Sequence, residues 1–192
     1  EIPKRPPTVE QRPVGMGLRP EYLIMTGLVN LKNSCYMNSG RQCLLGSKKL
    51  VAFCLTGNYR KHINMNSRLG SKGILANEFA SRTSEMYRLT NVSRPTYFNP
   101  IRFRRVLGSL NSLFSHCDQQ DCSEFLTYVL DTLHEDLNEN GNHPKLPELS
   151  KQEEQQRESL PIRVASTIEW ERYLKTNFSV IVDIFEGQMM SR

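Results

Sequence analysis

The feature with the clearest chemical potential is a cysteine that follows a polar loop. Cys35 stands where a segment rich in asparagine and serine, residues 30–34, runs into a sequence of helical character. The first turn of a helix carries unpaired N–H groups and a partial positive charge, which stabilise a thiolate. Asn33 or Ser34 would cap this helix, and Asn30 is placed to aim its side-chain amide at an oxyanion. Cys35 is therefore a candidate nucleophile; the alternative is an ordinary buried cysteine, one of five in the chain.

Two carboxylates form a second candidate site at the start of a long amphipathic segment. Asp121 and Glu124 are three residues apart, so a helix would place both on one face. Acidic side chains at a helix N-terminus complement its dipole, which is one interpretation. The other is a clamp, in which the two carboxylates bind the arginine side chains of a peptide in bidentate fashion.

A cysteine nucleophile also needs a base, usually a histidine, and a group that orients that base. The chain has four histidines, at positions 62, 116, 134 and 143. None of them has the sequence surroundings typical of a catalytic base. We therefore expect that no histidine in this chain completes the site.

Helices must position most of these side chains, because apolar residues recur every three to four positions over much of the chain. This spacing predicts helices over residues 35–45, 50–55, 74–90, 99–110, 118–137 and 164–175. In the last of these helices, Trp170 is expected to be a core anchor. Residues 178–185 are β-branched and aromatic, which predicts a strand that ends at Glu186. Because a lone strand leaves its hydrogen-bonding groups unpaired, we expect its sheet to continue outside this chain.

Two residues are unusual for the interior of the helix that begins at Cys35. Gly40 destabilises a helix by about 1 kcal/mol relative to alanine. Arg41 lies on or near the predicted buried stripe, where an unpaired cation is costly. Arg41 must therefore find an acid, reach solvent, or mark a decayed site.

Length and composition indicate one globular domain with polar segments around it. The 192 residues divide into a proline-rich extended leader (1–21), a helical region (22–140), a linker or insertion (141–162), and a final helix and strand (163–192). The net charge of +5 comes from short, scattered basic clusters, so we expect no nucleic-acid partner. No apolar run reaches membrane-spanning length, so we expect no membrane partner either. An odd number of cysteines without a C-x-x-C pair favours an intracellular, reducing location, cytoplasmic or nuclear.

Three regions of the chain resemble a known family. Residues 27–39 read GLVNLKNSCYMNS and are similar to the cysteine box of the ubiquitin-specific proteases. Residues 119–126, QQDCSEFL, and 130–138, LDTLHEDLN, are similar to the second box of that family. Residues 170–191 resemble the stretch that leads into the "fingers" of these enzymes. The resemblance covers about residues 22–140 and 165–192, with its two boxes in the family's order.

The resemblance implies an α+β fold: the mainly helical, thumb-like half of a papain-like cysteine peptidase, ending in the first strand of a sheet. It implies a deubiquitinase that cleaves after the C-terminal glycine of ubiquitin. Cys35 would be the nucleophile and Asn30 the oxyanion-hole amide. Gln120, Asp121 and Glu124 would bind the arginine-containing tail of ubiquitin. The implied partners are ubiquitin, or a ubiquitinated protein, and the C-terminal half of the catalytic domain.

Several departures from the family pattern leave a second interpretation open. Lys32 stands where the family usually has glycine, Ser34 replaces threonine, and Gly40 with Arg41 replaces an apolar pair. The family's histidine box and its zinc-binding finger cysteines are expected outside this chain, so we expect no metal or other cofactor within it. The alternative is a catalytically inactive relative that acts as a scaffold or a ubiquitin-binding module.

Overall fold

The structure, a computed structural model, describes residues 26–90, 97–140, 146–147 and 149–189. The proline-rich leader predicted at 1–21 lies outside these residues. In the described part of the chain, no helix is long and apolar enough to cross a membrane. All five cysteines are free thiols.

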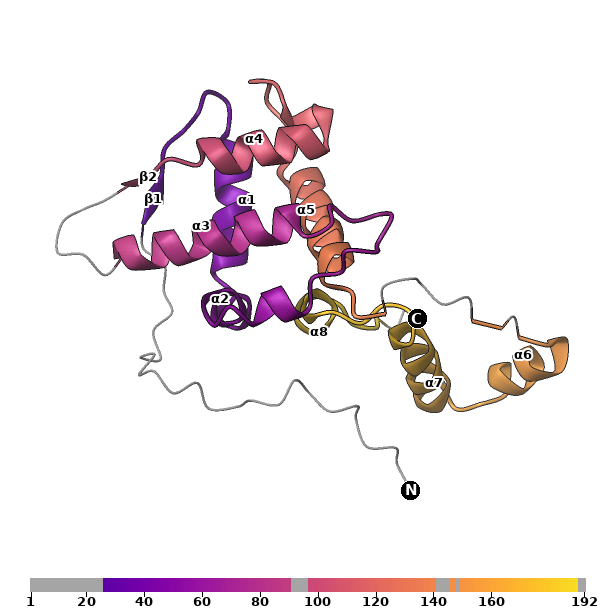
Figure 1. Cartoon of the computed structure of the whole chain (residues 1–192). Helices are drawn as coiled ribbons and strands as arrows, with labels where there is room; N and C mark the ends of the chain where they lie inside the picture. The colour runs from indigo at the N-terminus through magenta and orange to yellow at the C-terminus, as the bar shows by residue number, and fades with distance from the viewer. Residues whose placement is uncertain (1–25, 91–96, 141–145, 148, 190–192) are drawn as a thin grey trace.

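The site is carried by five helices and a very short sheet. In chain order these elements are β1 (Gly27–Leu28), α1 (Cys35–Leu45), α2 (Lys48–Leu55), the 3₁₀ helix η1 (Asn58–Lys61), α3 (Ile74–Thr90), β2 (Tyr97–Phe98), α4 (Ile101–Leu110), the 3₁₀ helix η2 (Ser112–Phe114) and α5 (Cys122–Leu137). Helix α3 packs against α2, α4 and α5, and α1 packs against α5 (Figure 1). The predicted helices of this region are confirmed, with ends that move by a few residues.

Large apolar side chains fill the space between these helices. Phe103 on α4 and Phe125 on α5 are fully buried, as is Met37 on α1. The ring centroids of Phe79 and Phe103 lie 6.4 Å apart in an edge-to-face arrangement, which suits the quadrupoles of aromatic rings. This contact holds α3 against α4, and the buried side chains of α1 and α5 belong to the same core.

The two strands form a parallel pair that holds the entry to the cysteine loop. Gly27 pairs with Tyr97 and Leu28 with Phe98. The ladder continues for one more bond, since the Val29 N–H donates to the Phe98 carbonyl at 3.0 Å. The chain therefore enters the cysteine loop from a fixed strand.

A buried carboxylate anchors the start of α3. Asp136 on α5 is fully buried and accepts hydrogen bonds from the N–H and hydroxyl of Ser71, each at 2.6 Å. It also accepts one from the Ala76 N–H at 3.1 Å. Because a buried carboxylate needs such donors, this one residue ties α5 to the first turn of α3.

The strand predicted over 178–185 is wrong: these residues form helix α8 (Val180–Phe185). Ser179 caps the helix by accepting a hydrogen bond from the Val182 N–H. Helix α8 packs against α2 and α5 and buries Ile181 and Val182. A β-branched composition favours a strand, but this apolar face is buried against two helices, so tertiary packing overrides the local preference. Because these residues are helical, the expectation that a strand here needs partners outside the chain no longer applies.

Two helices in the last part of the described chain lie at one side of the helical core (Figure 1). Within the predicted linker, Lys151–Glu158 form helix α6, which begins at a Ser150–Glu153 capping box. Helix α7 (Ile162–Leu174) follows, and neither helix contains a buried residue. Trp170 is not the core anchor predicted from the sequence: it is half-buried and stacks on Tyr173, with ring centroids 5.4 Å apart.

Candidate active site

Cys35 is the first residue of α1 and its side chain is exposed. The helix begins here because the preceding loop ends in non-helical backbone, while Met37 and Leu44 bury one face of the helix in the core. The thiol therefore lies at the positive end of the helix dipole and is open to a substrate. The predicted junction of loop and helix is confirmed; the catalytic role of Cys35 stays a prediction.

Side-chain hydrogen bonds hold the loop before Cys35. The Asn30 Oδ1 atom accepts from the Ser34 N–H at 3.1 Å and from the Ser34 hydroxyl at 3.0 Å. The Ser34 Oγ atom in turn accepts from the Leu31 N–H at 2.7 Å. Ser34 thus holds the loop together. Its side chain does not cap α1, although the sequence predicted Asn33 or Ser34 as a cap.

This arrangement determines where the Asn30 amide group points. Because Oδ1 is held by two donors from Ser34, the Nδ2 group of the same planar amide faces the other way. No described residue accepts a hydrogen bond from Nδ2, and Asn30 is exposed. An amide donor of this kind is what an oxyanion requires, although the role itself stays a prediction.

The loop contains two non-glycine residues in left-handed backbone conformation. Lys32 has φ of 55° and Asn33 has φ of 40°. Left-handed backbone favours glycine and is tolerated by asparagine, so Lys32 raises the energy of the loop by about 1–2 kcal/mol and Asn33 by less. The family's usual glycine in place of Lys32 is consistent with this backbone conformation.

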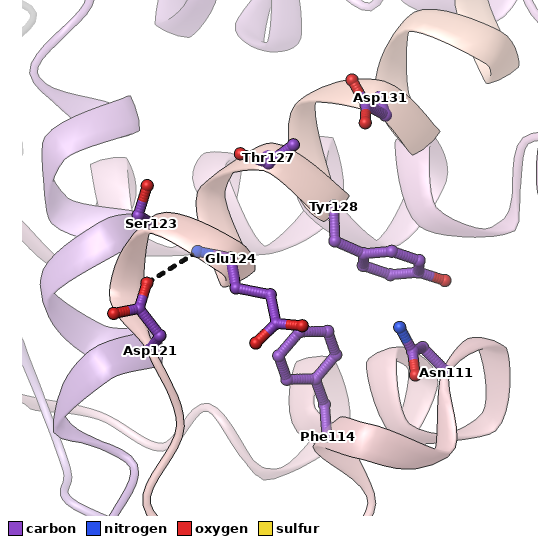
Figure 2. A pocket seen from close by; sticks show the side chains of 8 residues that line it. All are labelled: Asn111, Phe114, Asp121, Ser123, Glu124, Thr127, Tyr128 and Asp131. Atoms are coloured by element: carbon purple, nitrogen blue, oxygen red, sulfur yellow. Dashed lines mark hydrogen bonds between the residues drawn. The ribbon is translucent and has the colours of Figure 1, made fainter.

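Asp121 and Glu124 open α5 and line one pocket. Asp121 is the N-cap residue, and its Oδ1 atom accepts from the Glu124 N–H at 2.9 Å. The capping interpretation is thus confirmed for Asp121, but both side chains remain exposed. They line a pocket of about 430 Å³ whose other lining residues include Tyr128 and Asp131. Figure 2 shows Glu124 and Tyr128 extending from α5 toward Phe114 and Asn111.

This pocket combines three carboxylates with aromatic walls, which suits a cation on a flexible stem. Asp131 is the third acid; it was missed in the sequence, although it lies seven residues, about two turns, after Glu124. Tyr128 provides a partly exposed ring, whereas Phe114, with its ring centroid 5.5 Å away, is fully buried. The arrangement is able to accept a guanidinium group by ion pairing and stacking.

Gln120 has a different placement from the two acids. Its Nε2 atom donates to the Leu113 carbonyl at 3.2 Å, and Gln120 is not among the residues that line the pocket. In this structure Gln120 therefore ties the segment before α5 to η2. Its predicted contact with the ubiquitin tail stays a prediction.

Helices α1 and α5 approach closely at Gly40, which accounts for this unusual residue. A Cβ atom at Gly40 would lie 2.7 Å from Cδ1 of the buried Phe125 ring. The Phe125 ring also meets Tyr36, the neighbour of Cys35, with ring centroids 5.8 Å apart. The glycine thus lets the start of the acidic helix sit beside the helix of the cysteine.

The pKa of the Cys122 thiol also reflects the close approach of α1 and α5. Burial raises the pKa of Cys122, and the nearby Cys43 thiol and Asp121 carboxylate raise it further. Cys35 also contributes a smaller increase to this pKa, while a hydrogen bond with the Gly40 backbone lowers it. The candidate nucleophile and the start of the acidic helix therefore lie within electrostatic range of each other.

Arg41 neither pairs directly with an acid nor reaches solvent. Its side chain is fully buried, and its three guanidinium nitrogens have no hydrogen-bond partner among the described residues. The guanidinium carbon lies 4.7 Å from the ring centroid of Phe103 and 5.4 Å from that of Phe98. Burial lowers the pKa of Arg41 to about 10, and nearby Glu78 opposes this change. Cation–π contacts thus take the place of a salt bridge.

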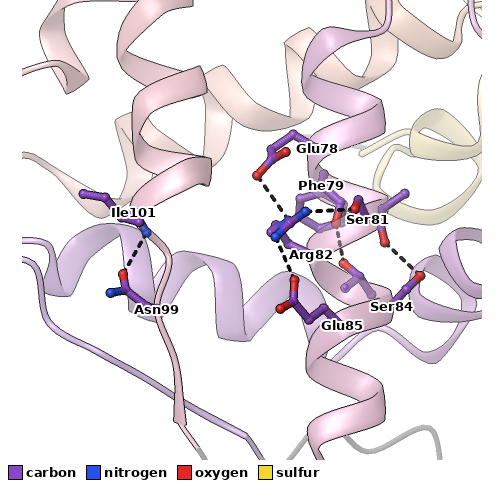
Figure 3. A network of polar contacts seen from close by, with 10 residues as sticks. Glu78, Phe79, Ser81, Arg82, Ser84, Glu85, Asn99 and Ile101 are labelled. Carbon is purple, nitrogen blue, oxygen red and sulfur yellow. Dashed lines mark hydrogen bonds and ion pairs between the residues drawn. The ribbon is translucent and has the colours of Figure 1, made fainter.

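The acids near Arg41 are already engaged on α3. Arg82 pairs with Glu78 at 3.3 Å and with Glu85 at 2.7 Å (Figure 3). Arg41 is therefore part of the packing between α1, β2 and α4. The structure places it in the core, six residues after Cys35.

The imidazole rings of two described histidines have partners other than the cysteine. The Nδ1 atom of His62 lies 2.7 Å from the Glu139 carboxylate, and that of His134 lies 2.8 Å from the Ser179 hydroxyl. The main-chain carbonyl of His116 accepts from Arg104. In the described ranges, no hydrogen bond or ion pair joins any of these histidines to Cys35. His143 lies outside the described residues.

Comparison with known proteins assigns the chain to a family. A sequence model described as ubiquitin carboxyl-terminal hydrolase matches residues 26–192. The chain belongs to the ubiquitin carboxyl-terminal hydrolase family.

Curated relatives agree with this assignment. Over 167 residues the chain is 54% identical to ubiquitin carboxyl-terminal hydrolase 4 of Saccharomyces cerevisiae, covering 86% of this chain and 18% of the relative. The corresponding protein of Eremothecium gossypii is 51% identical, with 86% of this chain and 20% of the relative covered. Ubiquitin carboxyl-terminal hydrolase 5 of S. cerevisiae is 44% identical, with 88% and 22% covered. The chain spans about a fifth of the length of these relatives.

Proposed function

We propose that the protein containing this chain is a cysteine-type deubiquitinase. In this proposal the chain forms the mainly helical, thumb-like half of a papain-like domain and acts together with the domain's C-terminal half. The observation that carries the proposal is the exposed Cys35 at the start of α1, preceded by an Asn30 amide whose oxygen is held by Ser34. The family assignment supports the same chemistry.

The proposed reaction follows from these groups. The Cys35 thiolate attacks the carbonyl carbon of the last glycine of ubiquitin, and the Asn30 Nδ2 group donates to the resulting oxyanion. The intermediate expels the amine, which takes a proton from a histidine supplied by the rest of the domain, and leaves a thioester. Water then hydrolyses the thioester and regenerates the thiol. In our proposal this chain contributes amino-acid side chains and no cofactor to the reaction. A structural zinc ion would belong to the fingers region outside this chain.

The acidic pocket supplies the proposed contact with substrate. Asp121 and Glu124 would pair with arginine side chains in the ubiquitin tail, and Gln120 would contact the same tail. The placement of three carboxylates in one pocket with Tyr128 supports a cationic ligand. The proposed partner is therefore ubiquitin or a ubiquitinated protein.

A ubiquitin probe with a C-terminal electrophile tests the activity in the full-length protein. We expect a covalent adduct with the wild-type protein and none with Cys35→Ser. Cys43→Ser and Cys117→Ser are matched controls, because both thiols are also exposed, and they should still form the adduct. Absence of an adduct with the wild-type protein would contradict the proposal.

The inactive scaffold remains the competing function and predicts a different result. It would bind ubiquitin without forming an adduct or hydrolysing a ubiquitin-tail substrate. Two of the departures that motivated it are accounted for by packing: Gly40 meets the Phe125 ring, and Arg41 stacks on Phe103. Hydrolysis that disappears in Cys35→Ser would exclude the scaffold interpretation.

A further inference from the structure

The cysteine loop is strained, so something must hold it in its observed conformation. Lys32 and Asn33 both adopt left-handed backbone, with φ of 55° and 40°. Strained backbone of this kind persists only where the surrounding structure determines it. The bonds between Asn30 and Ser34 close the loop on itself but do not attach it to the rest of the protein.

Arg104 on α4 provides that attachment. Its Nη1 atom donates to the Leu31 carbonyl at 2.7 Å, and its Nη2 atom donates to the His116 carbonyl at 2.5 Å. The two carbonyls are 85 positions apart in the sequence: one lies in the cysteine loop and the other precedes the acidic helix. One planar guanidinium therefore joins the two segments that carry the candidate site.

A second bond joins the same two segments, from a residue two positions after Leu31 to the residue directly after His116. The Asn33 Nδ2 atom donates to the Cys117 carbonyl at 3.1 Å. Together with the Arg104 fork, this bond sets the spacing between the loop that carries Asn30 and the segment that leads into Asp121. The Arg104 charge also reaches the phenol beside the nucleophile, since it opposes the rise that burial causes in the pKa of Tyr36.

The core of α4 does not depend on Arg104. Phe103 and Leu107 are fully buried and hold the helix against its neighbours, whereas Arg104 is half-buried and exposes part of its side chain. Both of its described hydrogen bonds go to main-chain carbonyls rather than to side chains. The contacts of Arg104 therefore hold the cysteine loop in position and are not part of the packing of the core.

We propose that Arg104 is a positioning residue for the reaction: by bridging the Leu31 and His116 carbonyls, it holds the strained cysteine loop at a fixed distance from the acidic helix. This inference rests on the proposed function for its effect on turnover. Its effect on loop order stands on the geometry alone. A small displacement of reacting groups is enough to slow a reaction by about 100-fold.

The test uses the full-length protein with Arg104→Ala, Arg104→Lys and the control Arg105→Ala. Arg105 is the next residue in the chain and is exposed. With a ubiquitin–fluorophore substrate, we expect Arg104→Ala to lower kcat at least about 10-fold while KM changes less than about 3-fold. Arg104→Lys should be intermediate, because one ammonium group does not reproduce the fork. Arg105→Ala should match the wild type.

Hydrogen exchange supplies a readout that does not need activity. The Leu31 and Ser34 amides donate only to side chains of the loop itself, so they report its order directly. In Arg104→Ala we expect these amides to exchange at least about 10-fold faster, while amides of α3 keep their wild-type rates. A merely structural role would instead speed exchange throughout α3 and lower kcat only in proportion to the unfolded fraction.

Each outcome bears on the inference. If Arg104→Ala matches Arg105→Ala in kcat and in loop exchange, the inference is wrong. If Arg104→Ala does not fold, Arg104→Lys decides: wild-type kcat and loop exchange in that variant would also overturn it. If the loop amides exchange faster but the wild-type protein does not cleave ubiquitin conjugates, the proposed function fails while the positioning of the loop by Arg104 stands.

Discussion

The carboxylate of Asp121 has an observed role in folding and a proposed role in substrate binding. One oxygen caps α5 through the Glu124 N–H, and the exposed side chain still lines the acidic pocket. Asparagine is as good a cap as aspartate, so the two roles can be separated by removing the charge alone.

We expect Asp121→Asn and Glu124→Gln each to raise KM for a ubiquitin substrate by about 10-fold, because a hydrogen bond to a charged group contributes about 1.5–3 kcal/mol. The kcat value should change less than about 3-fold. Steady-state kinetics of the full-length protein check this. Asp118→Asn, an exposed acid that does not line the pocket, is the control. A fall in kcat at unchanged KM would contradict the clamp.

Ionisation of the buried Cys54 thiol makes the free energy of unfolding depend on pH in the alkaline range. Burial raises the pKa of this thiol from its ordinary 9.0 to about 12, against smaller opposing effects of Arg41 and Thr83. Above pH 9 the unfolded chain loses this proton while the folded chain keeps it. Stability from Cys54 is therefore fully present below pH 9 and is lost as the pH rises toward 12, by about 1 kcal/mol per pH unit.

Urea unfolding followed by circular dichroism at pH 9 and pH 10 measures this effect. In Cys54→Ala the loss of stability between the two pH values should be smaller than in wild type by about 1 kcal/mol. Val51→Ala, which truncates a buried neighbour on the same helix without removing an ionisable group, should keep the wild-type pH dependence. Equal pH dependence in Cys54→Ala and Val51→Ala would rule the effect out.

Variants of Arg41 separate the contribution of its charge to stability from that of its side-chain volume. Its cation lies against the rings of Phe98 and Phe103 with no hydrogen-bond partner among the described residues. We expect Arg41→Met, which keeps most of the volume, to stay within about 1 kcal/mol of wild type, and Arg41→Ala to lose about 3 kcal/mol. Urea unfolding of both variants checks this. If Arg41→Met is as unstable as Arg41→Ala, the charge itself is required.

At the scale of elements, the contact between α1 and α5 governs the site. Gly40 is the residue that lets these helices approach, since an added Cβ would meet Phe125 at 2.7 Å and 2.8 Å and Leu126 at 3.3 Å. The same helices carry Cys35 at the start of one and Asp121 before the start of the other.

Gly40→Ala should therefore destabilise the protein, although alanine favours helix by about 1 kcal/mol. Overpacking against a buried ring costs about 1–3 kcal/mol, so we expect a net loss of about 1–2 kcal/mol in urea unfolding. Ser39→Ala, at the preceding exposed position, is the control and should not be destabilised. A more stable Gly40→Ala would show that the two helices separate without penalty.

At the scale of the whole molecule, the chain divides into a packed core and a loosely held extension. Helices α1, α3 and α5 bury large apolar side chains, whereas α6 and α7 bury none. Hydrogen bonds from Asn138 and Asn140 to the carbonyls of Thr176 and Leu174 attach the end of α7 to the end of α5.

Hydrogen exchange across this 192-residue chain should follow that division. We expect amides in α6 and α7 to exchange at least about 100-fold faster than those in α3 and α5, because few buried contacts oppose their local opening. Mass spectrometry of peptic peptides measures both regions in one experiment. Equal protection in α5 and α7 would show that the extension is as stable as the core.

The sequence by itself determined the helices of the core and the junction at Cys35. Apolar spacing gives the helical period, and the polar loop marks where α1 begins, so both are local properties. The two boxes of residues also indicated the family before any geometry was known. The spacing of Asp121 and Glu124 predicted one shared helix face, and both do line one pocket.

Only the tertiary structure decided the rest, because those features depend on contacts between distant segments. The run at 180–185 is helical since its apolar face packs on α2 and α5, against its β-branched composition. The fit of Gly40 against Phe125, the burial of Arg41 between two rings and the bridge from Arg104 to the cysteine loop join residues far apart in the chain. A local sequence pattern does not specify contacts between distant segments, so these contacts follow only from the packing of the helices.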